Sequence, residues 1–537
     1  MSRSRTLPWV LLLLTLSTVF LFGNDRGHFY RSEHHNYLSS HGMAMAANLS
    51  PAHNFLMFVR LVPAPGGQGH LYAPYNRFPI GSVALTKLAI LPFNGDLSKQ
   101  IYAARVLMLL CFAASAVLAY LSLARLTSRW VAVTATLLAF SSSYCLYYND
   151  MVFNDVPSLF GMMLAFHGMV TFARDGRFRQ LVVKTCAALL LGWQVFGLLL
   201  AFILLSLASG LVCALRARSI RTFMLRSRRP LTLGIVALAF GTLLLTFNLA
   251  NEYVALNGAH APAELPTVQS ALRRTGQSQS FNAAYADMLA WPNFLVQQLY
   301  RVGGMSVPYG ALSAYRVGLV YGLAGILLLL AGAAIILSAC LLIGTARRDK
   351  VLLSALALSG LCWALPMRGF TAFHDFQSLF YVGFPLVCFA LLMHRLCSDR
   401  LVVAVAGLSA CIFVLSTVQM RDVGHDEQAA RRQAAVLADF EAIRRQTTDA
   451  DRAIFVPGTK PRSLLDPPFG AFFATEYYLS GRPIAYRHKN ADLRISRSLH
   501  ADHPGLLTPE NRLIFLYDES AHNSRAATSK ESGQLPR

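Results

Sequence analysis

The chain has 537 residues, of which 55% are hydrophobic and only 14% are charged. It is too long for one compact soluble domain and too apolar for a soluble enzyme, a disordered tail protein or a fibrous repeat. The formal charge of +21 would suit a nucleic-acid binder, but residues 419–537 hold 17 basic against 15 acidic side chains. The excess therefore lies among the apolar segments, where the positive-inside rule explains it, and we predict a polytopic membrane protein with no nucleic-acid partner.

Apolar segments long enough to cross a bilayer follow one another along the chain. The first, residues 7–23, comes after Arg3 and Arg5 and lacks a small-x-small cleavage site, so we interpret it as a retained signal anchor. The others are residues 101–124, 130–147, 155–173, 181–215, 231–249, 317–344, 351–366, 379–393 and 401–418. Because the run 181–215 is long enough for two crossings around Gly197, we predict about eleven transmembrane helices.

The charges between these segments predict the orientation. With two crossings in the run 181–215, one set of loops carries 18 basic residues against three acidic ones. With a single crossing, every later basic loop would change sides. The N-terminus is therefore predicted to be cytoplasmic, and residues 24–100, the turn 148–154 and the loops 250–316 and 367–378 to face outward.

Two regions outside the membrane are predicted to fold. Residues 79–93 are apolar with a single Lys87 and too short to span, which suits an amphipathic helix in the interface. We divide the chain into a membrane domain, 1–418, and an outer α/β domain, 419–537, with a disordered tail at 520–537. The predicted elements of this second domain are helices 426–446 and 471–479 and strands 453–456, 483–486 and 513–517.

The first outer loop is rich in groups that exchange protons. Six acids and histidines fall within 17 residues, namely Asp25, His28, Glu33, His34, His35 and His41. A carboxylate or imidazole just outside a bilayer can take the proton of an incoming hydroxyl, as group transfer to an alcohol requires. A solvated loop with incidental histidines explains the composition equally well. A metal site on the consecutive Glu33, His34 and His35 is disfavoured, because adjacent residues rarely point at one ion.

A second cluster lies in the outer turn that ends at Asn154-Asp155-Val156-Pro157. Asp155 has the position of a helix N-cap, and Pro157 suits the first helical turn. This structural role and a functional one are compatible, since a capping carboxylate at the membrane surface can still bind a substrate hydroxyl or a cation.

A third cluster holds Arg368 and His374 in a short outer turn between two late spans. A guanidinium offers paired donors to a phosphate, so these residues suit the phosphate of a membrane lipid. Ordinary interfacial anchoring by arginine and aromatic residues is the alternative. Arg273, Arg274 and Arg301 are further candidates for the phosphate.

Four short motifs accompany the acidic residue of the first outer loop. They are Tyr72-Ala-Pro-Tyr75-Asn-Arg77-Phe78-Pro79-Ile-Gly81, Tyr102-Ala-Ala-Arg105-Val, Asn154-Asp155-Val-Pro157 and His374-Asp375-Phe376. This set resembles the GT-C glycosyltransferases, and more closely the bacterial branch related to protein O-mannosyltransferases and the lipid A aminoarabinose transferase. An outer C-terminal α/β module is a common addition in that branch.

The resemblance implies inverting transfer of a sugar from a polyprenyl phosphate to an acceptor hydroxyl at the outer face of the bacterial inner membrane. It implies a loop-one carboxylate as the base, for which we favour Glu33 over Asp25, because Tyr37 and a helical-looking stretch follow it. The sequence departs from the family's usual Asp-Glu pair, since Ser32 precedes Glu33.

The remaining roles also follow from the resemblance. Asp155 would orient the acceptor or the phosphate. Arg105, Arg368 and His374 would stabilise the departing lipid phosphate. Support for the acceptor or for the first loop would come from His34, His35, Tyr37, Tyr75 and Arg77.

The acceptor class stays open between lipid, glycan and protein. The interpretation requires no cofactor, and a divalent cation is compatible with it but not indicated by the residues. The main rival is a transporter or lipid flippase, which would carry ionisable groups at mid-membrane and an internal repeat. A second rival is an O-antigen polymerase or ligase, which would need a long basic outer loop between late helices.

Overall fold

The computed structural model describes residues 6–22, 33–63, 70–256, 265–278, 282, 286–302, 347–372 and 374–423, together with five short strands between residues 454 and 518. The predicted span 317–344 lies outside the described residues. So do the predicted helices 426–446 and 471–479, the tail 520–537 and Asp25.

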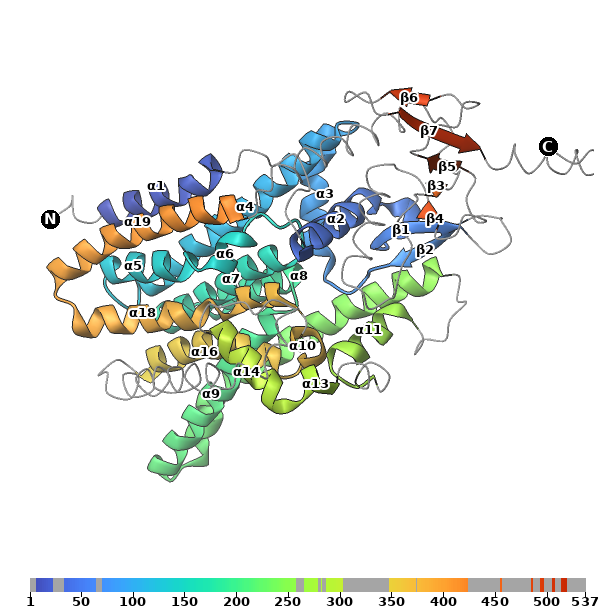
Figure 1. The fold of residues 1–537 in the computed structure, drawn as a ribbon. Coiled ribbons are helices and arrows are strands. Elements are labelled where there is room, and N and C mark those ends of the chain that lie inside the picture. The colour runs from blue at the N-terminus through green and yellow to red at the C-terminus, as the bar shows by residue number, and fades with distance from the viewer. Residues whose placement is uncertain are drawn as a thin grey trace, which may run out of the picture.

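The described helices pack side by side into an elongated bundle (Figure 1). Its helices are α1 Leu7–Leu21, α4 Leu97–Leu123, α5 Arg129–Phe140, α7 Asp155–Asp175, α8 Phe178–Leu191, α9 Val195–Ala217, α10 Ile220–Ala255, α16 Arg347–Ala364, α18 Gly383–Leu396 and α19 Asp399–Val423. Within the described part of the chain, six helical segments are long and apolar enough to cross a membrane, and three apolar helices are shorter. These helices confirm the prediction of a polytopic membrane protein.

The long apolar run 181–215 forms two helices as predicted, but the break is not at Gly197. The chain leaves α8 at Gly192, where an extended φ of −179° interrupts the helix. A side chain at Gly192 would collide with the hydroxyl of Ser158, so glycine lets the two helices turn closely against α7. Gly197 instead lies inside α9, where its missing side chain admits Trp363.

Two other predicted spans have different limits. The run 130–147 forms α5 and a separate short helix, α6 Ser143–Tyr147. The predicted span 231–249 is the central part of the 36-residue α10, which continues outward at both ends of the apolar segment. Pro230 lies inside this helix.

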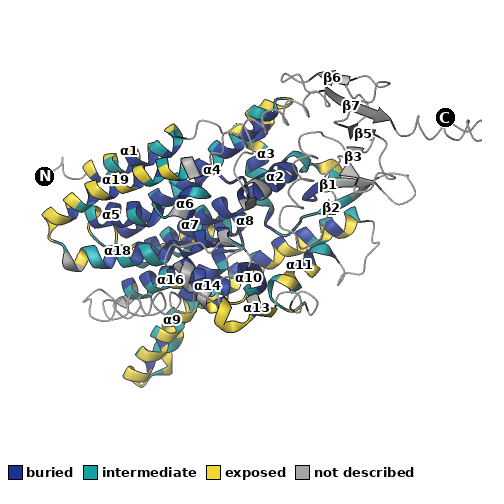
Figure 2. Cartoon of the chain, in the orientation of Figure 1, coloured by how far each residue is buried: buried dark blue, intermediate teal, exposed yellow. Residues whose placement is uncertain are grey.

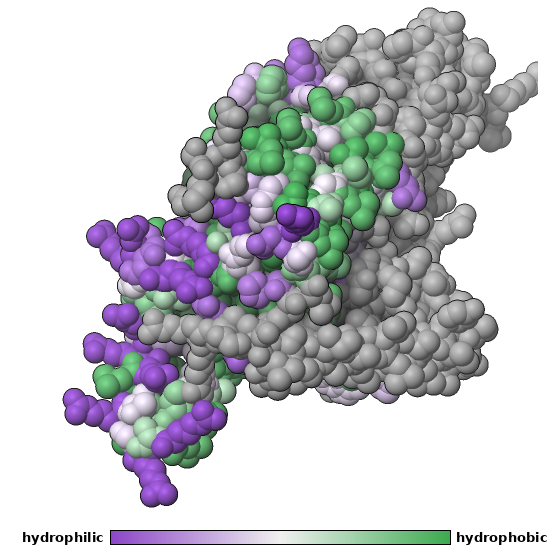
Figure 3. Space-filling view, turned by 90° about the vertical axis from the view of Figure 1, so that its left-hand side faces the viewer, coloured by the Kyte–Doolittle hydropathy of each residue, from purple (hydrophilic) through white to green (hydrophobic). Residues whose placement is uncertain are grey.

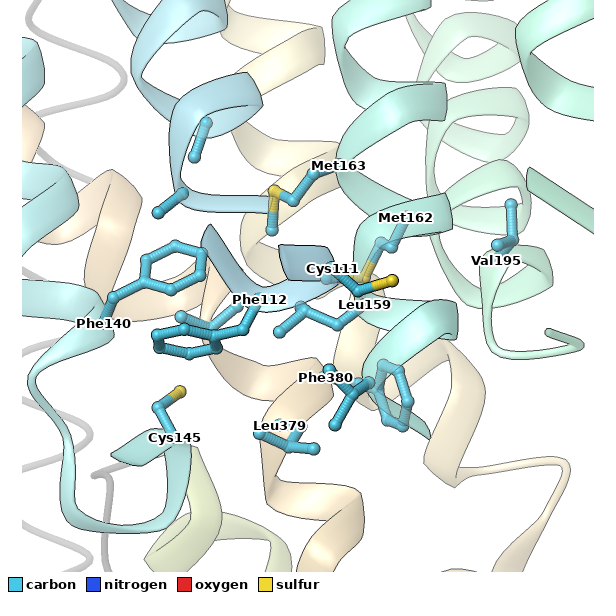
Figure 4. Packing of buried hydrophobic residues seen from close by; sticks show 14 of the residues in the cluster. Cys111, Phe112, Phe140, Cys145, Leu159, Met162, Met163, Val195, Leu379 and Phe380 are labelled. Carbon is cyan, nitrogen blue, oxygen red and sulfur yellow. The ribbon is translucent and has the colours of Figure 1, made fainter. Parts of the chain in front are cut away.

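The interior of the bundle consists of aromatic, aliphatic and sulfur-containing side chains from neighbouring helices (Figure 4). Phe112 of α4 and Phe140 of α5 meet edge to face with ring centroids 5.4 Å apart. Figure 2 shows buried residues concentrated on the central helices, while the free end of α9 is exposed. Many exposed side chains of α9 and α10 are leucines and isoleucines, as expected for surfaces that face lipid.

A folded layer covers one end of the bundle. It contains α2 Glu33–Asn48, η2 Pro51–His53, the antiparallel strands β1 Phe58–Pro63 and β2 His70–Pro74, α3 Ile80–Ile90 and η3 Leu91–Phe93. The helix predicted at 79–93 is therefore present as α3 and η3. The β1–β2 hairpin was not predicted, so the membrane domain is not wholly α-helical.

Shorter elements from later in the chain complete this end. They are α11 Pro266–Arg274, α13 Ala286–Leu289, α14 Trp291–Val302, α17 Arg368–Thr371 and η6 Asp375–Tyr381. The backbone of α17 lies close against α11, because a side chain at Gly369 would overlap the carbonyl oxygen of Arg273.

The C-terminal strands form one mixed sheet in the order β4-β3-β5-β7-β6. The strands are β3 Ile454–Phe455, β4 Ile484–Ala485, β5 Leu493–Ser496, β6 Gly505–Leu507 and β7 Leu513–Asp518. Strands β3, β4 and β7 lie where the sequence predicted strands, whereas β5 and β6 were missed. Both missed strands are short, and β5 carries a charged Arg494 that breaks its apolar pattern.

Helix α2 is anchored tightly on the outer turn that precedes α7. Ser39 Oγ accepts a hydrogen bond of 3.1 Å from the backbone N–H of Val152. A side chain at Gly42 would lie only 1.8 Å from the carbonyl oxygen of Val152, so the two backbones touch at this glycine. The position of α2 therefore depends on the absence of a side chain at residue 42.

Gly42→Ala is expected to destabilise the protein, because the added methyl group must push α2 off the turn. Overpacking of this kind costs about 1–3 kcal/mol. The measurement is thermal unfolding of the detergent-solubilised protein. Gly407→Ala in α19 is the matched control, since its added methyl meets no atom within 4 Å, and it should leave the unfolding temperature unchanged or raise it. Equal unfolding temperatures for both variants would contradict the close approach of α2 to Val152.

Candidate functional site

The segment Tyr75–Phe78 is held by hydrogen bonds between side chains and backbone carbonyls, which join it to three other parts of the chain. Asn248 of α10 donates to the carbonyl of Phe78 at 2.7 Å, and the side chain of Asn76 donates to the carbonyl of Asn248. Thr267 Oγ1 at the start of α11 donates to the carbonyl of Asn76 at 3.0 Å, and Trp193 Nε1 donates to that of Arg77 at 3.1 Å. The motif around Arg77 is therefore a fixed platform between α8, α10 and α11.

Arginines from three distant parts of the chain gather beside this platform. Arg77 lies over the ring of Tyr75, with its Cζ 4.4 Å from the ring centroid. Arg274, at the end of α11, lies 4.8 Å from the Phe78 ring and 4.3 Å from the Phe370 ring.

The third arginine, Arg368 of α17, lies 4.7 Å from the ring of Trp291. It also lies beside Gly276, since a side chain at that glycine would meet Arg368 Nη2. All three arginines are half-buried. An aromatic ring lies against a flat face of each of these three guanidiniums. Within the described part of the chain, no group accepts a hydrogen bond from their N–H donors.

The charges of these arginines act on one another. The pKa of Arg274 is lowered to about 10, mainly by burial and also by the nearby positive charge of Arg77, while Tyr75 and Asp155 act in the opposite direction. Arg274 nevertheless stays protonated near neutral pH. The cluster is thus a partly desolvated, positively charged site, which favours a bound anion.

Asp155 is fully buried at the first position of α7 and joins three elements. Its Oδ1 accepts hydrogen bonds from Gln194 Nε2 at 3.0 Å and from Gln377 Nε2 at 2.7 Å. Gln377 in turn accepts from Trp363 Nε1 at 2.9 Å. The sequence suggested that Asp155 caps α7, but Asn154 has the N-cap position and Asp155 is the first residue of the helix. The Asp155 carboxylate turns inward and ties α7 to α9 and η6.

Asp155→Ala is expected to destabilise the fold strongly. It leaves two buried glutamine amides without their acceptor, at a cost of about 1–3 kcal/mol each, whereas Asp155→Asn keeps one oxygen and should be milder. Thermal unfolding of the purified protein measures the difference. Asp175, at the other end of α7, forms a partly exposed ion pair with Arg125, so Asp175→Ala is the control and should cost less than about 1 kcal/mol. Equal unfolding temperatures for Asp155→Ala and Asp175→Ala would mean that the hydrogen bonds of Asp155 do not stabilise the fold.

The start of α2 is fixed by a buried contact between a histidine and an aspartate. His35 is fully buried, and its Nε2 lies 2.9 Å from Asp150 Oδ1 in the turn before α7. The His35 ring also stacks on Tyr148 with a centroid distance of 6.1 Å. Glu33 is the first residue of α2, so this pair positions the turn of helix that carries the predicted base.

The structure brings together only some of the predicted site residues. Tyr75, Arg77 and Arg368 lie in or beside the arginine cluster, and His374 contacts Phe370, which also packs on Arg274. His41 of α2 lies 4.9 Å from Tyr75 and links the first outer helix to the cluster.

The other predicted residues lie elsewhere or are described only by their backbone. Arg105 is completely buried in α4, whereas the three arginines of the cluster are half-buried. His34 and Tyr37 lie in the first two turns of α2 with Glu33.

Several residues that position the site were not predicted from the sequence. Gln194, Gln377 and Trp193 are single polar or aromatic residues at helix ends, with no motif around them. Asp150 belongs to the outer turn that the sequence marked, but its pairing with His35 spans 115 positions. Arg274 was only an alternative phosphate ligand, and it proves to lie at the centre of the cluster.

Among the described residues, no group of three or more His, Cys, Asp or Glu side chains is arranged to hold an ion.

Apolar helices of membrane-spanning length, covered at one end by a folded layer with a half-buried cationic cluster, define a multi-pass membrane protein with a polar site at one end. No protein-family profile and no curated protein matches the sequence. Solved structures do match the fold. ArnT from Cupriavidus metallidurans bound to undecaprenyl phosphate aligns with a TM-score of 0.51 and 12% identity, over 88% of this chain and 84% of ArnT.

Two further structures align less closely. ArnT from the same organism in the apo state has a TM-score of 0.49 and 12% identity, over 90% of this chain and 86% of ArnT. The archaeal oligosaccharyltransferase AglB from Archaeoglobus fulgidus, in complex with an inhibitory peptide and a dolichol-phosphate, has a TM-score of 0.49 and 12% identity. That alignment covers 91% of this chain but only 65% of AglB. The similarity to undecaprenyl phosphate-bound ArnT shows that the chain has the GT-C fold, which confirms the resemblance predicted from the sequence.

Proposed function

We propose that the protein is a glycosyltransferase that moves a sugar from a polyprenyl phosphate to an acceptor hydroxyl at the outer face of the inner membrane. The observation that carries this proposal is the cluster of Arg77, Arg274 and Arg368, whose guanidinium donors are unused by the described residues. The fold supports it, because ArnT, a protein of the same fold, binds undecaprenyl phosphate.

The cluster has the chemistry that a lipid phosphate requires. Aromatic rings cover the flat faces of the guanidiniums, so their in-plane N–H groups are directed to an anion at the edge. Hydrogen bonds from arginine to phosphate are charge-assisted and strong, and desolvation strengthens them further. His374, beside Phe370, borders the same site. Arg105, which is fully buried in α4, stays a further candidate for the phosphate.

The proposed reaction balances with Glu33 as base. Its carboxylate takes the proton of the acceptor hydroxyl, and the freed oxygen attacks the anomeric carbon from the face opposite the phosphate. The bond between the anomeric carbon and the phosphate oxygen breaks, and the arginines hold the additional negative charge of the lipid phosphate as it leaves. The configuration of the sugar is inverted. Asp155 and the His35–Asp150 pair are positioning residues in this scheme.

The first test is a comparison of a deletion strain with its parent. A single sugar residue missing from the glycolipids or the surface polysaccharide would identify both sugar and acceptor. The transporter alternative would instead be supported by two results together. The glycans of the deletion strain would be unchanged, and vesicles reconstituted from its membrane proteins would lose the polyprenyl phosphate movement seen with those of the parent.

The orientation is a separate prediction from the charge pattern. A reporter that is active only outside the cytoplasm should work when fused after Val418 in α19 and fail when fused after Arg229 near the start of α10. Activity at Arg229 and none at Val418 would place the candidate site on the cytoplasmic side and exclude the proposed reaction geometry.

A further inference from the structure

The end of α9, the start of α10 and the turn between them carry a dense set of exposed arginines. Helix α9 ends at Ala217 and α10 begins at Ile220. Six arginines lie in residues 216–229, and all are exposed: Arg216, Arg218, Arg221, Arg226, Arg228 and Arg229. The sequence has no aspartate or glutamate between residues 176 and 251. We call residues 215–230 the arginine hairpin.

The charge of the hairpin is not neutralised by acidic side chains, whereas part of the charge of the neighbouring loops is. Arg229 lies 5.5 Å from the ring of Phe172 near the end of α7, so the hairpin starts from the same end of the bundle as that loop. There, Arg174 is paired with Asp349 at 2.9 Å, and Arg125 with Asp175 at 3.0 Å. Among the described residues, no acidic side chain pairs with an arginine of the hairpin. Its charge is therefore available to a partner.

Apolar side chains are interleaved with these arginines. Leu215, Ile220, Met224 and Leu225 are between 62% and 81% exposed. Figure 1 shows α9 projecting away from the bundle at this end, and Figure 3 shows the tip as a lobe whose surface mixes hydrophilic and hydrophobic residues. A helix surface that combines arginines with exposed aliphatic side chains is typical of segments that lie in a membrane interface.

The length of α10 gives the depth of the hairpin. Its 36 residues span about 54 Å, whereas the hydrocarbon core of a bilayer is only about 30 Å thick. Residues 231–248 cover about 27 Å of that core, so residues 220–230 extend roughly 16 Å further. Arg226, Arg228 and Arg229 then lie about 3–8 Å beyond the core, at the depth of the phospholipid headgroups of the leaflet opposite the candidate site. The other arginines of the hairpin lie in the water layer next to these headgroups.

We propose that the arginine hairpin binds anionic phospholipid headgroups of that leaflet. Its guanidiniums pair with headgroup phosphates, and Ile220, Met224 and Leu225 pack beside them in the interfacial layer. An anionic lipid is favoured over a zwitterionic one, because six unpaired positive charges attract a net negative headgroup. This proposal does not depend on the glycosyltransferase activity.

Native mass spectrometry of the full-length protein in detergent tests the proposal. Phosphatidylglycerol and phosphatidylcholine with identical acyl chains are titrated separately against the wild type and three variants. The wild type should bind phosphatidylglycerol roughly tenfold more tightly than phosphatidylcholine. R221Q/R228Q should lose most of this preference, whereas R221K/R228K, which keeps the charge, should retain much of it. R177Q/R179Q removes the same charge from a neighbouring basic loop and should behave as the wild type.

Several results would overturn the proposal. They are equal binding of the two lipids by the wild type, an unchanged preference in R221Q/R228Q, and an equal loss in R177Q/R179Q, which would mean diffuse surface charge. Binding of polyglutamate in place of phosphatidylglycerol, abolished by R221Q/R228Q, would identify an acidic protein as the partner instead. A single sharp peak in size-exclusion chromatography for each variant shows that the differences do not reflect unfolding.

Discussion

Glu33→Gln should abolish most sugar transfer while the protein still inserts and binds its lipid. The substitution keeps the size and hydrogen bonding of the side chain but removes the basic oxygen that takes the proton of the acceptor. General base catalysis is worth roughly 100- to 10,000-fold, so a loss of that order in kcat is expected. The measurement is the rate of sugar transfer by the purified variant in membranes of defined lipid composition.

Asp25→Asn is the internal control for the base and should have a much smaller effect. The opposite pattern, with Asp25→Asn inactive and Glu33→Gln active, would move the base to Asp25 but leave the reaction class intact. Full transfer by Glu33→Gln, Asp25→Asn and Asp155→Asn alike would exclude a carboxylate mechanism and make the transporter alternative the better one.

Arg274→Ala should produce the second large effect, a loss of about 100- to 1,000-fold in kcat/KM for the lipid-linked donor. Removal of one preorganised donor from a site of developing negative charge typically has this magnitude. Arg274→Lys should recover only part of the activity, because lysine keeps the charge but loses the paired donors and the flat face that packs between Phe78 and Phe370. Binding of a sugar-free polyprenyl phosphate should weaken in parallel.

Arg273 is the matched control, since it is the preceding residue of α11 but is exposed. Arg273→Ala should bind and turn over the donor like the wild type. Similar losses in Arg273→Ala and Arg274→Ala would show that only the general positive charge of α11 matters. Wild-type activity in Arg274→Ala would remove the arginine cluster from the mechanism. The alternative that Arg368 is an interfacial anchor would then extend to Arg274.

Local features of the sequence predicted much of the membrane bundle. The division of the run 181–215 into two helices followed from its length and from the alternation of basic loops, and α8 and α9 confirm it. The place of the break did not follow, because Gly192 and Gly197 look alike in sequence. Only the collision that a side chain at Gly192 would have with Ser158 explains why the chain turns there.

The outer layer was predicted less completely. The helix at 79–93 has a continuous apolar pattern and was identified, whereas the β1–β2 hairpin consists of short strands without clear alternation. The identity of the base and the limit between the membrane domain and residues 419–537 stay predictions, as does the cytoplasmic N-terminus.

The sequence by itself determined the class of the protein, because hydrophobic length and loop charge are properties of contiguous segments. It also marked the Tyr75–Phe78 motif and the turn before α7 as places of interest. The tertiary structure alone decided which side chains meet: Arg77, Arg274 and Arg368 gather around aromatic rings, and Asp155 joins Gln194 to Gln377. Gln377 and Asp155 are 222 positions apart. No local pattern encodes such pairs, since they depend on how the helices pack.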